Sequence, residues 1–412
     1  MNTAHITIIG SALAGNKGAA AMLESSIATL QERIPGVRFT LFSMYPAEDR
    51  RQNTYPNLDV VDATPRALGV TINSLALLYR VLPPLRGLLR RRSRAIRALA
   101  SSQVLLDQGG ITFADGREKF LLYNVASILP ALNTGVPVFK CAQAVGPFEH
   151  PLNRAVAKTF LPRVATTVTR GRISREHAEG LGLSNLVAGA DYAFSLELAG
   201  TEAAEAAQFV PAGFFDGDED VVGISPSTVV QKKVDARGGD YAGQLAGFID
   251  QLVAGGRKVL VVPHSARAGS EKTHNNDLLL CARIEARVSP NPRVRFIGTE
   301  LPSQVLRYLI GRCDLFVASR FHAMVSSLAM GVPTLVIGWG HKYQEVLEMF
   351  ELEEWAFSHD QLSPGYLKKR FEALSANREA VSAKLAQHLP QVKRRSLAQA
   401  DLIAEIVNAR VR

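Results

Sequence analysis

Two side chains suited to anion binding and proton transfer, Arg320 and His322, lie two positions apart in the segment 318–323 (ASRFHA). The segment follows an apolar run and precedes a helical pattern, so both residues are expected at a strand–helix junction, where they could face one cleft. Arginine holds a carboxylate or phosphate through two parallel hydrogen bonds, and histidine moves a proton near neutral pH. The pair predicts an anion site, against the alternative of a surface arginine beside a helix-start histidine.

A second histidine and a glycine loop are further candidates. His264 directly follows the apolar run 258–262 and Pro263, and is expected at a cleft rim unless it is only a capped or solvated histidine. Residues 15–18 (GNKG) precede a helical pattern, where backbone N–H groups and the helix dipole favour an anion. The loop is neither a Walker A motif nor a clean G-x-G-x-x-G, so a tight turn is the alternative. We take Asn16, Lys17 and Gly18 as candidate contacts.

Two other strand ends carry glycine and glutamine. Gly109 and Gly110 follow the apolar strand predicted at 103–108, and Gln143 follows the one predicted at 136–142. Glycine admits a ligand close to the backbone, and a glutamine amide suits a sugar or phosphate, although a structural role explains both segments equally well.

The elements that must position these residues alternate strand and helix in both halves of the chain. This order predicts parallel sheets with right-handed crossovers, and ligands at the carboxyl ends of the strands. Because 412 residues exceed one ordinary core, we expect two doubly wound Rossmann-like domains of glycosyltransferase-B type, with the site in the cleft between them. An alanine-, glycine- and acid-rich linker over 201–220 divides a domain at 1–205 from one at 218–385, and 386–412 is expected to form a C-terminal helix.

Composition narrows the class of protein. The 47% hydrophobic and 21% charged residues are typical of a globular chain, and none of the three cysteines makes a C-x-x-C pair, so a reducing cytoplasm is expected. There is no signal-peptide pattern and no uninterrupted apolar run of about 20 residues. No cluster of metal ligands is visible, and no metal is expected.

The net charge of +9 favours anionic partners, and arginines crowd the segment Arg80–Arg97. No RNA-binding aromatic motif and no zinc-finger spacing is present, so we expect no nucleic acid partner. A solvated helix face is one interpretation of the basic segment. Peripheral docking on an anionic membrane, at its cytoplasmic face, or on a lipid-linked sugar is the other.

Taken in order, these motifs resemble the polysaccharide pyruvyl transferase family. The resemblance spans about residues 6 to 340 and includes segments with the patterns G-N-x-G, G-G, G-Q-x-x-G-P-like, D-x-A-F-like, P-H, R-x-H-A and A-x-G-x-P. In this chain they are residues 15–18, 109–110, 142–147, 191–194, 263–264, 320–323 and 329–333.

The resemblance implies transfer of pyruvate from phosphoenolpyruvate, as co-substrate, to a sugar of a polysaccharide or of its lipid-linked precursor, usually as a cyclic ketal. It then implies that Arg320, with Lys17 or Arg170, binds the phosphoenolpyruvate anions in the C-terminal, donor-side domain, and that the N-terminal domain is the acceptor side. His322 or His264 would act as acid or base, and Asp191 would orient the sugar or a neighbouring cation.

One departure from the family pattern affects the expected reaction. Many members carry an acid soon after G-N-x-G, whereas this chain has alanines at 19–21 and its nearest acid is Glu24. A non-catalytic saccharide-binding protein is therefore one alternative. A nucleotide-sugar glycosyltransferase is another: the E-x7-E pair of retaining members is replaced by Ser319 and Ser327, so only an inverting enzyme remains.

Overall fold

The computed structural model describes residues 3–269 and 275–411, and the chain divides into two compact units. The first unit comprises residues 1–14, 22–195 and 393–412, and the second comprises 15–21 and 196–392. The predicted ranges did not anticipate two features of this division. The glycine loop 15–21 belongs with the second unit, and the last twenty residues belong with the first.

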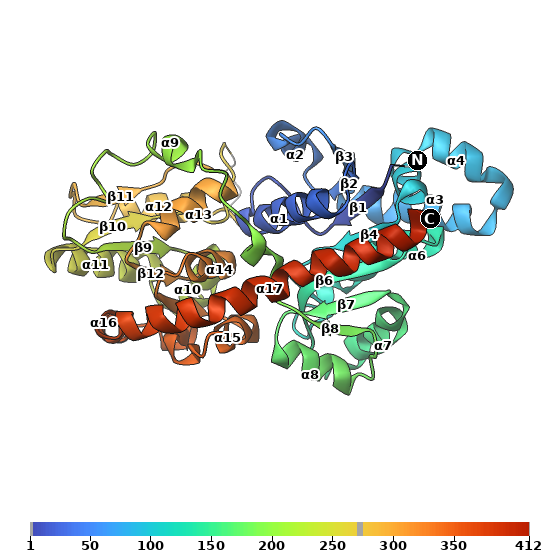
Figure 1. Cartoon of the computed structure of the whole chain (residues 1–412). Helices are drawn as coiled ribbons and strands as arrows, with labels where there is room; N and C mark the ends of the chain where they lie inside the picture. Colours follow the sequence, from blue (N-terminus) through green and yellow to red (C-terminus); the bar gives the residue numbers. More distant parts are fainter. Residues whose placement is uncertain (1–2, 270–274, 412) are drawn as a thin grey trace. The chain divides into compact units, whose positions relative to one another are not determined.

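The first unit is built on a parallel sheet in the order β3-β2-β1-β4-β6-β7-β8, with the short β5 paired to β6 (Figure 1). The order reverses between β1 and β4, where a doubly wound sheet opens a ligand crevice at its carboxyl edge. The strands are β1 (His5–Ile9), β2 (Arg38–Ser43), β3 (Leu58–Asp62), β4 (Val104–Asp107), β5 (Ile111–Thr112), β6 (Val138–Val145), β7 (Thr166–Thr169) and β8 (Leu186–Ala188).

Helices connect these strands, as the alternating pattern predicted. They are α1 (Lys17–Arg33), α2 (Pro46–Gln52), α3 (Asn73–Val81), α4 (Arg86–Arg92), α5 (Arg94–Ser101), α6 (Leu121–Thr134), α7 (Pro151–Phe160) and α8 (Arg172–Gly180). A π-helical segment (Ala67–Ile72) leads into α3, and a 3-10 turn (Pro83–Leu85) leads into α4.

The second unit repeats the plan with a parallel sheet in the order β11-β10-β9-β12-β13-β14, which reverses between β9 and β12. Its strands are β9 (Val221–Ser225), β10 (Lys258–Val261), β11 (Val294–Phe296), β12 (Leu315–Ala318), β13 (Thr334–Gly338) and β14 (Ala356–Ser358). Its helices are α9 (Glu202–Ala206), α10 (Thr228–Asp235), α11 (Tyr241–Ala254), α12 (Leu278–Glu285), α13 (Ser303–Gly311), α14 (Phe321–Ala329), α15 (His341–Glu348) and α16 (Pro364–Ala376). The expectation of two doubly wound α/β sheets is confirmed.

The predicted C-terminal helix is confirmed as α17 (Arg378–Val411), whose later part is the predicted segment from residue 386 onward. Residues 378–389 contain neither glycine nor proline, so the helix continues unbroken through them. Its first residues, 378–392, belong to the second unit and the remainder to the first.

The core of the first unit contains a buried ion pair. All eight residues of β6 are buried, which is typical of a parallel strand covered on both faces. One of them is Lys140, whose ammonium donates to the Asp107 carboxylate at the end of β4. Asp107 also accepts the Gly109 N–H (3.0 Å), so the pair fixes the start of the glycine loop after β4.

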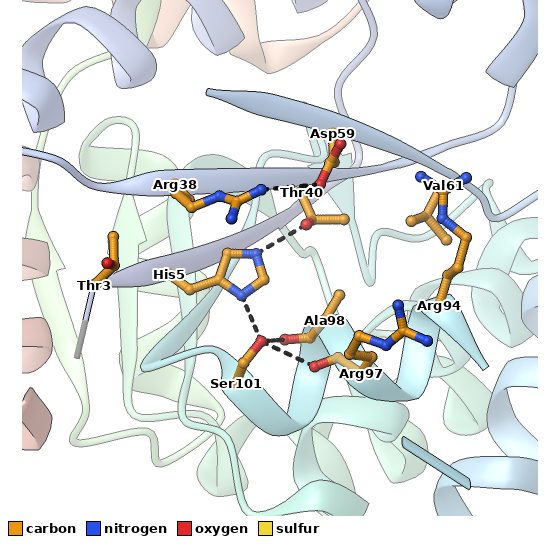
Figure 2. Close-up of a pocket in the computed structure, with 10 residues that line it drawn as sticks. All are labelled: Thr3, His5, Arg38, Thr40, Asp59, Val61, Arg94, Arg97, Ala98 and Ser101. Carbon is orange, nitrogen blue, oxygen red and sulfur yellow. Dashed lines mark hydrogen bonds and ion pairs between the residues drawn. The ribbon is translucent and has the colours of Figure 1, made fainter. Parts of the chain in front are cut away.

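A cavity of about 270 Å³ lies at the amino-terminal edge of the first sheet, away from the crevice edge (Figure 2). His5 and Arg38, the first residues of β1 and β2, line it together with Arg94 and Arg97 of α5. Asp59 of β3 also lines it, 3.7 Å from Arg38, so its walls carry three arginines and one carboxylate.

No single helix within residues 3–269 and 275–411 is long and apolar enough to cross a membrane. The helical segments Ala67–Val81 and Pro83–Arg92 are long and apolar enough only when they are taken together, and the bend between them is 120°.

We predict that Asp107→Asn destabilises the first unit by about 3–5 kcal/mol, because it leaves Lys140 buried without a counter-charge. The midpoint of thermal unfolding measures the effect. The matched control is Asp59→Asn, because Asp59 is 58% exposed and lies 3.7 Å from Arg38, and a surface pair contributes about 0–1 kcal/mol.

Replacing both partners, as Asp107→Leu with Lys140→Met, is expected to recover most of the lost stability. Equal midpoints for Asp107→Asn and Asp59→Asn would contradict the structural role of the pair.

Candidate functional site

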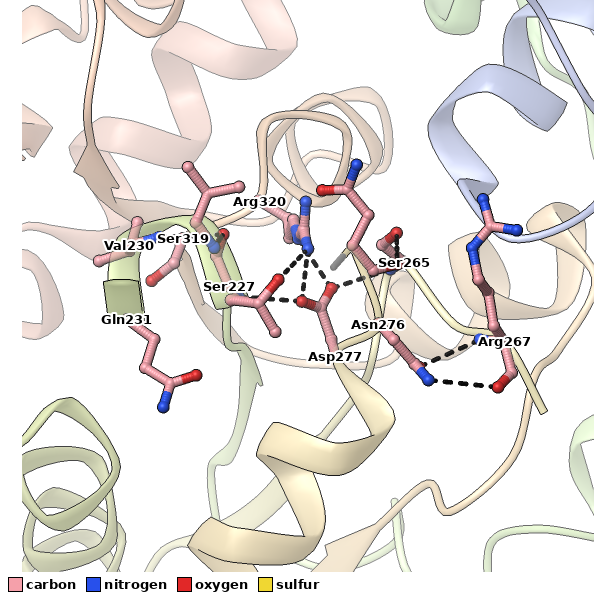
Figure 3. Close-up of polar contacts among 12 residues, drawn as sticks. Ser227, Val230, Gln231, Ser265, Arg267, Asn276, Asp277, Ser319 and Arg320 are labelled. Atoms are coloured by element: carbon pink, nitrogen blue, oxygen red, sulfur yellow. Dashed lines mark hydrogen bonds and ion pairs between the residues drawn. The ribbon is translucent and has the colours of Figure 1, made fainter. Parts of the chain in front are cut away.

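Three strand-end loops of the second unit meet at a buried ion pair between Asp277 and Arg320 (Figure 3). Arg320 follows β12 and donates through Nε (2.7 Å) and Nη2 (2.5 Å) to the two carboxylate oxygens of Asp277, which precedes α12. The same oxygens accept the N–H groups of Ser265, after β10, and of Thr228, after β9 (2.9 and 3.0 Å). One carboxylate thus ties together the carboxyl ends of the three central strands.

This pairing leaves part of the Arg320 guanidinium available. Nη2 also donates to the Thr228 hydroxyl (3.0 Å), whereas Nη1 has no hydrogen-bond partner in the described part of the chain. Burial alone would lower the pKa of Arg320, but the Asp277 carboxylate outweighs it and raises the pKa, so the group stays charged. With 16% of its side chain exposed, Arg320 can offer Nη1 to an anion.

His264 is 3% exposed and lies among cations. Burial lowers its pKa well below 6.5, and the positive charges of His322, Arg320 and Arg307 lower it further. Arg307 is itself buried and donates to the Leu196 carbonyl (2.8 Å). His264 is therefore a neutral imidazole at physiological pH, in surroundings that favour an incoming anion.

The predicted glycine loop folds against this cluster. The Lys17 N–H donates to the His264 carbonyl (3.1 Å), and Asn16 forms a β-bridge with Ser265. The Asn16 side chain accepts the Gly18 N–H (3.1 Å) and so caps the start of α1. The loop thus brings His264 and the start of α1 together within the second unit.

Lys17 has a different partner from the predicted one. It is 2% exposed, and its ammonium lies 2.7 Å from the Glu300 carboxylate, which also accepts the Gly15 N–H (2.9 Å). The anion that Lys17 contacts in this structure is therefore part of the protein. Since its charge is compensated in a buried pair, the geometry favours a role in holding the loop over direct contact with substrate.

Gly18 sets the distance between the loop and the second histidine. A Cβ atom at Gly18 would lie 2.0 Å from His322 Nδ1. Two non-bonded atoms cannot come this close, so position 18 has no room for a side chain. His322 belongs to the first turn of α14, and Arg320 at the N-cap position supplies no side-chain cap there. The amino end of this helix therefore adds positive potential at the imidazole.

A cavity of about 330 Å³ is lined by residues of β13, α15 and β14. Trp339 and Tyr343 line it, and the Tyr343 hydroxyl donates to the Ser319 carbonyl (3.2 Å) next to Arg320. Tyr343 is thus the contact between this cavity and the loop that carries the arginine.

The other predicted site residues lie in the first unit. Arg170 and Asp191 form a buried ion pair (2.9 Å), and Arg170 also donates to the Gly110 carbonyl (3.0 Å). Gln143 is fully buried, accepts from Thr112 (2.6 Å) and donates to the Asp107 carbonyl (2.7 Å).

These contacts differ from the predicted ligand contacts. The amide of Gln143 is used inside the unit, and Arg170 and Asp191 compensate each other's charge, so the three side chains support the glycine loop. Of the five predicted residues in this unit, Gly109 and Gly110 are the ones that are partly exposed.

Sequence reasoning missed the two carboxylates of the second unit, Asp277 and Glu300. Asp277 stands directly before the start of α12, and this N-cap position was a usable signal. Glu300 had none, because its partners Lys17 and Gly15 lie 283 and 285 residues away along the chain.

Among residues 3–269 and 275–411, no group of three or more His, Cys, Asp or Glu side chains is placed to hold a metal ion.

Two doubly wound parallel sheets, with His264, His322 and Arg320 in strand-end loops of one, define a protein of glycosyltransferase-B-like fold. The chain belongs to the polysaccharide pyruvyl transferase family, whose sequence model matches residues 16–341. It is 22% identical to the amylovoran biosynthesis protein AmsJ of Erwinia amylovora, over 94% of this chain and 95% of the relative. The family and this relative identify a transferase of polysaccharide biosynthesis.

Solved structures support the fold. A putative UDP-N-acetylglucosamine 2-epimerase from Listeria monocytogenes aligns with a TM-score of 0.59 at 12% identity, covering 97% of this chain and 94% of that one. A glycotransferase of kitacinnamycin aligns with a TM-score of 0.53 at 14% identity, covering 98% and 99%. At these identities the similarity concerns the fold alone.

We predict that Gly18→Ala lowers transfer activity at least about a hundredfold, because the methyl group must displace the His322 ring by an ångström or more. Steady-state kinetics measure the loss. Gly247→Ala in α11 is the matched control, because a Cβ there meets nothing within 4 Å. Equal activity of the two variants would contradict the proposed contact.

The lowered pKa of His264 predicts a pH-dependent stability. Because the unfolded histidine binds a proton more readily than the folded one, stability is fully present above about pH 6.5 and falls as the pH drops below it. His264→Gln should flatten this dependence in thermal-unfolding midpoints measured across a pH series.

Burial also lowers the pKa of His5 and His359, so a smaller slope should remain in the variant. An unchanged slope would show that His264 ionises as freely in the folded protein as in the unfolded chain.

Proposed function

We propose that the protein transfers pyruvate from phosphoenolpyruvate to two hydroxyl groups of a saccharide, forming a cyclic ketal and releasing phosphate. The observation that carries this proposal is the arrangement of His264 and His322 beside Arg320 and Arg307, where the strongest charges acting on His264 are all positive. Phosphoenolpyruvate carries a phosphate and a carboxylate on three carbons, which suits such a cluster.

The reaction defines what the site must supply. The methylene carbon of phosphoenolpyruvate gains a proton, two hydroxyl oxygens bond in turn to the central carbon, and its bond to the phosphate oxygen breaks. Of the two protons that the hydroxyls lose, one corresponds to the proton gained by the new methyl group and the other leaves with hydrogen phosphate. The site therefore needs an anion clamp, an acid directed at carbon and a base directed at oxygen.

The residues of the second unit match these roles. Nη1 of Arg320 and the amino end of α14 hold the donor anion, with Asp277 fixing the guanidinium plane. His264, neutral before binding, accepts a hydroxyl proton, and His322 protonates the methylene carbon. In this scheme Lys17 positions the loop through Glu300.

The first unit is assigned to the saccharide acceptor. Its glycine loop at Gly109 and Gly110 lies at the carboxyl end of β4, and the Arg170–Asp191 pair supports it through the Gly110 carbonyl. Because glycine has no side chain, the partly exposed backbone at Gly109 and Gly110 allows a sugar ring to approach closely. The same proposal includes an acceptor saccharide that is part of a lipid-linked precursor.

The test combines phosphoenolpyruvate with a panel of saccharide acceptors and follows phosphate release and acceptor mass. The expected product gains one pyruvate and loses one water per transfer. His322→Ala should lower kcat by roughly 10²–10⁴-fold. Arg320→Lys should mainly raise KM for phosphoenolpyruvate, because one ammonium cannot engage Asp277 and a ligand in the same plane.

His388→Ala is the control, because His388 lies on α17, where it is 3.9 Å from Glu351 and outside the cluster. Thermal stabilisation by a nucleotide sugar and none by phosphoenolpyruvate would indicate a glycosyltransferase and would refute the proposal. Full turnover in both His322→Ala and Arg320→Lys would refute the residue assignments.

A further inference from the structure

Residues 67–92, here called the arm, form a bent helical segment on the first unit: the π-helical turn Ala67–Ile72, α3, the turn Pro83–Leu85 and α4 (Figure 1). The arm exposes an unusual number of large aliphatic side chains, each between 38% and 64% exposed. They are Val70, Leu77, Leu78, Val81, Leu82, Leu85 and Leu88.

The arm is attached through its opposite face. Leu68, Ile72 and Ala76 are buried in the core of the unit, and Asn73 donates to the Ala126 carbonyl of α6 (3.1 Å). A surface helix normally has one apolar face towards the core and one polar face towards water. Since α3 is already anchored through its inner face, the exposed leucines and valines do not serve the core, and they mark an interaction surface.

The charge of this region has one sign. Residues 63–106 contain eight arginines and no aspartate or glutamate. Three arginines have partners within the protein. Arg80 donates to the Asn133 side-chain carbonyl (3.3 Å), and Arg86 donates to the Tyr79 carbonyl (2.9 Å). Arg97 donates to the carbonyls of Arg90 and Arg91 at the end of α4 (3.0 and 2.8 Å).

Five other arginines are exposed, and their side chains have neither a hydrogen bond nor an ion pair in the described part of the chain. They are Arg66, before the arm, and Arg90, Arg91, Arg92 and Arg94. Their charges are therefore available to an external anion.

The basic cavity at the amino-terminal edge of the sheet adjoins the arginine end of the arm. Arg97 lines this cavity while its guanidinium contacts the end of α4, and Arg94, Arg38 and His5 line it as well (Figure 2). Asp59 lines the cavity too and pairs with Arg38 (3.7 Å), which leaves the charges of Arg94 and Arg97 for a phosphate group in a volume of about 270 Å³.

We propose that the arm docks the protein on an anionic lipid bilayer, with its aliphatic side chains in the interface and a lipid phosphate at the basic cavity. This inference goes beyond the proposed reaction and does not depend on it. Aliphatic side chains beside arginines match an interfacial membrane surface. Nucleic acid binding would call for exposed aromatic stacking side chains, and Tyr79 of α3 is instead covered by Arg86 (5.1 Å to the ring centroid).

The test is co-sedimentation of the full chain with vesicles of phosphatidylglycerol and phosphatidylcholine, compared with phosphatidylcholine alone. Binding is expected with the anionic vesicles and should weaken with salt. Arg90→Gln, Arg91→Gln, Arg92→Gln and Arg94→Gln together should weaken binding on the order of a hundredfold or more. Leu77→Gln, Val81→Gln and Leu88→Gln together should also abolish sedimentation.

Two controls on α7 carry the same kinds of change at fewer exposed positions of the same unit: Arg154→Gln with Lys158→Gln, and Leu152→Gln. Both should bind as the unchanged protein does. Thermal-unfolding midpoints close to that of the unchanged protein establish that the arm variants are folded.

Three results would overturn the proposal: no binding to anionic vesicles at low salt, equal losses in the arm and control variants, or binding that survives either set of arm substitutions. Stabilisation of the protein by inorganic phosphate, without any vesicle binding, would identify the cavity as a site for a free phosphate ligand and would also overturn it.

Discussion

The candidate site of the second unit depends on the buried ion pair between Asp277 and Arg320. Asp277 accepts hydrogen bonds from the guanidinium and from two backbone N–H groups, so one carboxylate holds the loops after β9, β10 and β12 in register. Burial of a carboxylate is costly unless its oxygens accept hydrogen bonds, and burial of a guanidinium is costly without a counter-charge. The pair thereby fixes Nη1 of Arg320 and the start of α14, and with them the surroundings of His264 and His322.

The glycine loop contributes by its small size. Gly18 lets the start of α1 approach the His322 ring, and Gly15 adopts a positive φ of 78° with the Arg267 guanidinium 3.0 Å from where a Cβ would lie. Lys17 and Glu300 neutralise each other beneath this loop. The positive potential around His264 therefore comes from His322, Arg320 and Arg307, whose charges lower its pKa after burial has done so.

The sequence predicted the two parallel α/β sheets, because strand–helix alternation and strand-end glycines are local signals. It also predicted His264, Arg320, His322 and the GNKG loop as candidate site residues, and the structure places these residues in one unit. It did not reveal that Arg170 and Asp191 pair with each other, or that Glu300 pairs with Lys17. Tertiary packing brings such partners together from distant segments, so the spacing of residues along the sequence does not predict the pairs. The polarity of Gln143 fits both a ligand contact and a structural role. Only its complete burial, which the structure shows, distinguishes the structural role from the ligand contact.

The central claim is that the cluster of His264, His322, Arg320 and Arg307 in the second unit receives a small donor with two anionic groups, a phosphate and a carboxylate. The most direct measurement is the pKa of His264 by NMR, with and without phosphoenolpyruvate, with His264→Gln used to assign the signal. The account predicts a pKa well below 6.5 in the free protein and a clear rise when phosphoenolpyruvate binds, because the bound anion offsets the neighbouring positive charges. A pKa unaffected by saturating phosphoenolpyruvate, in protein that is catalysing transfer, would contradict it.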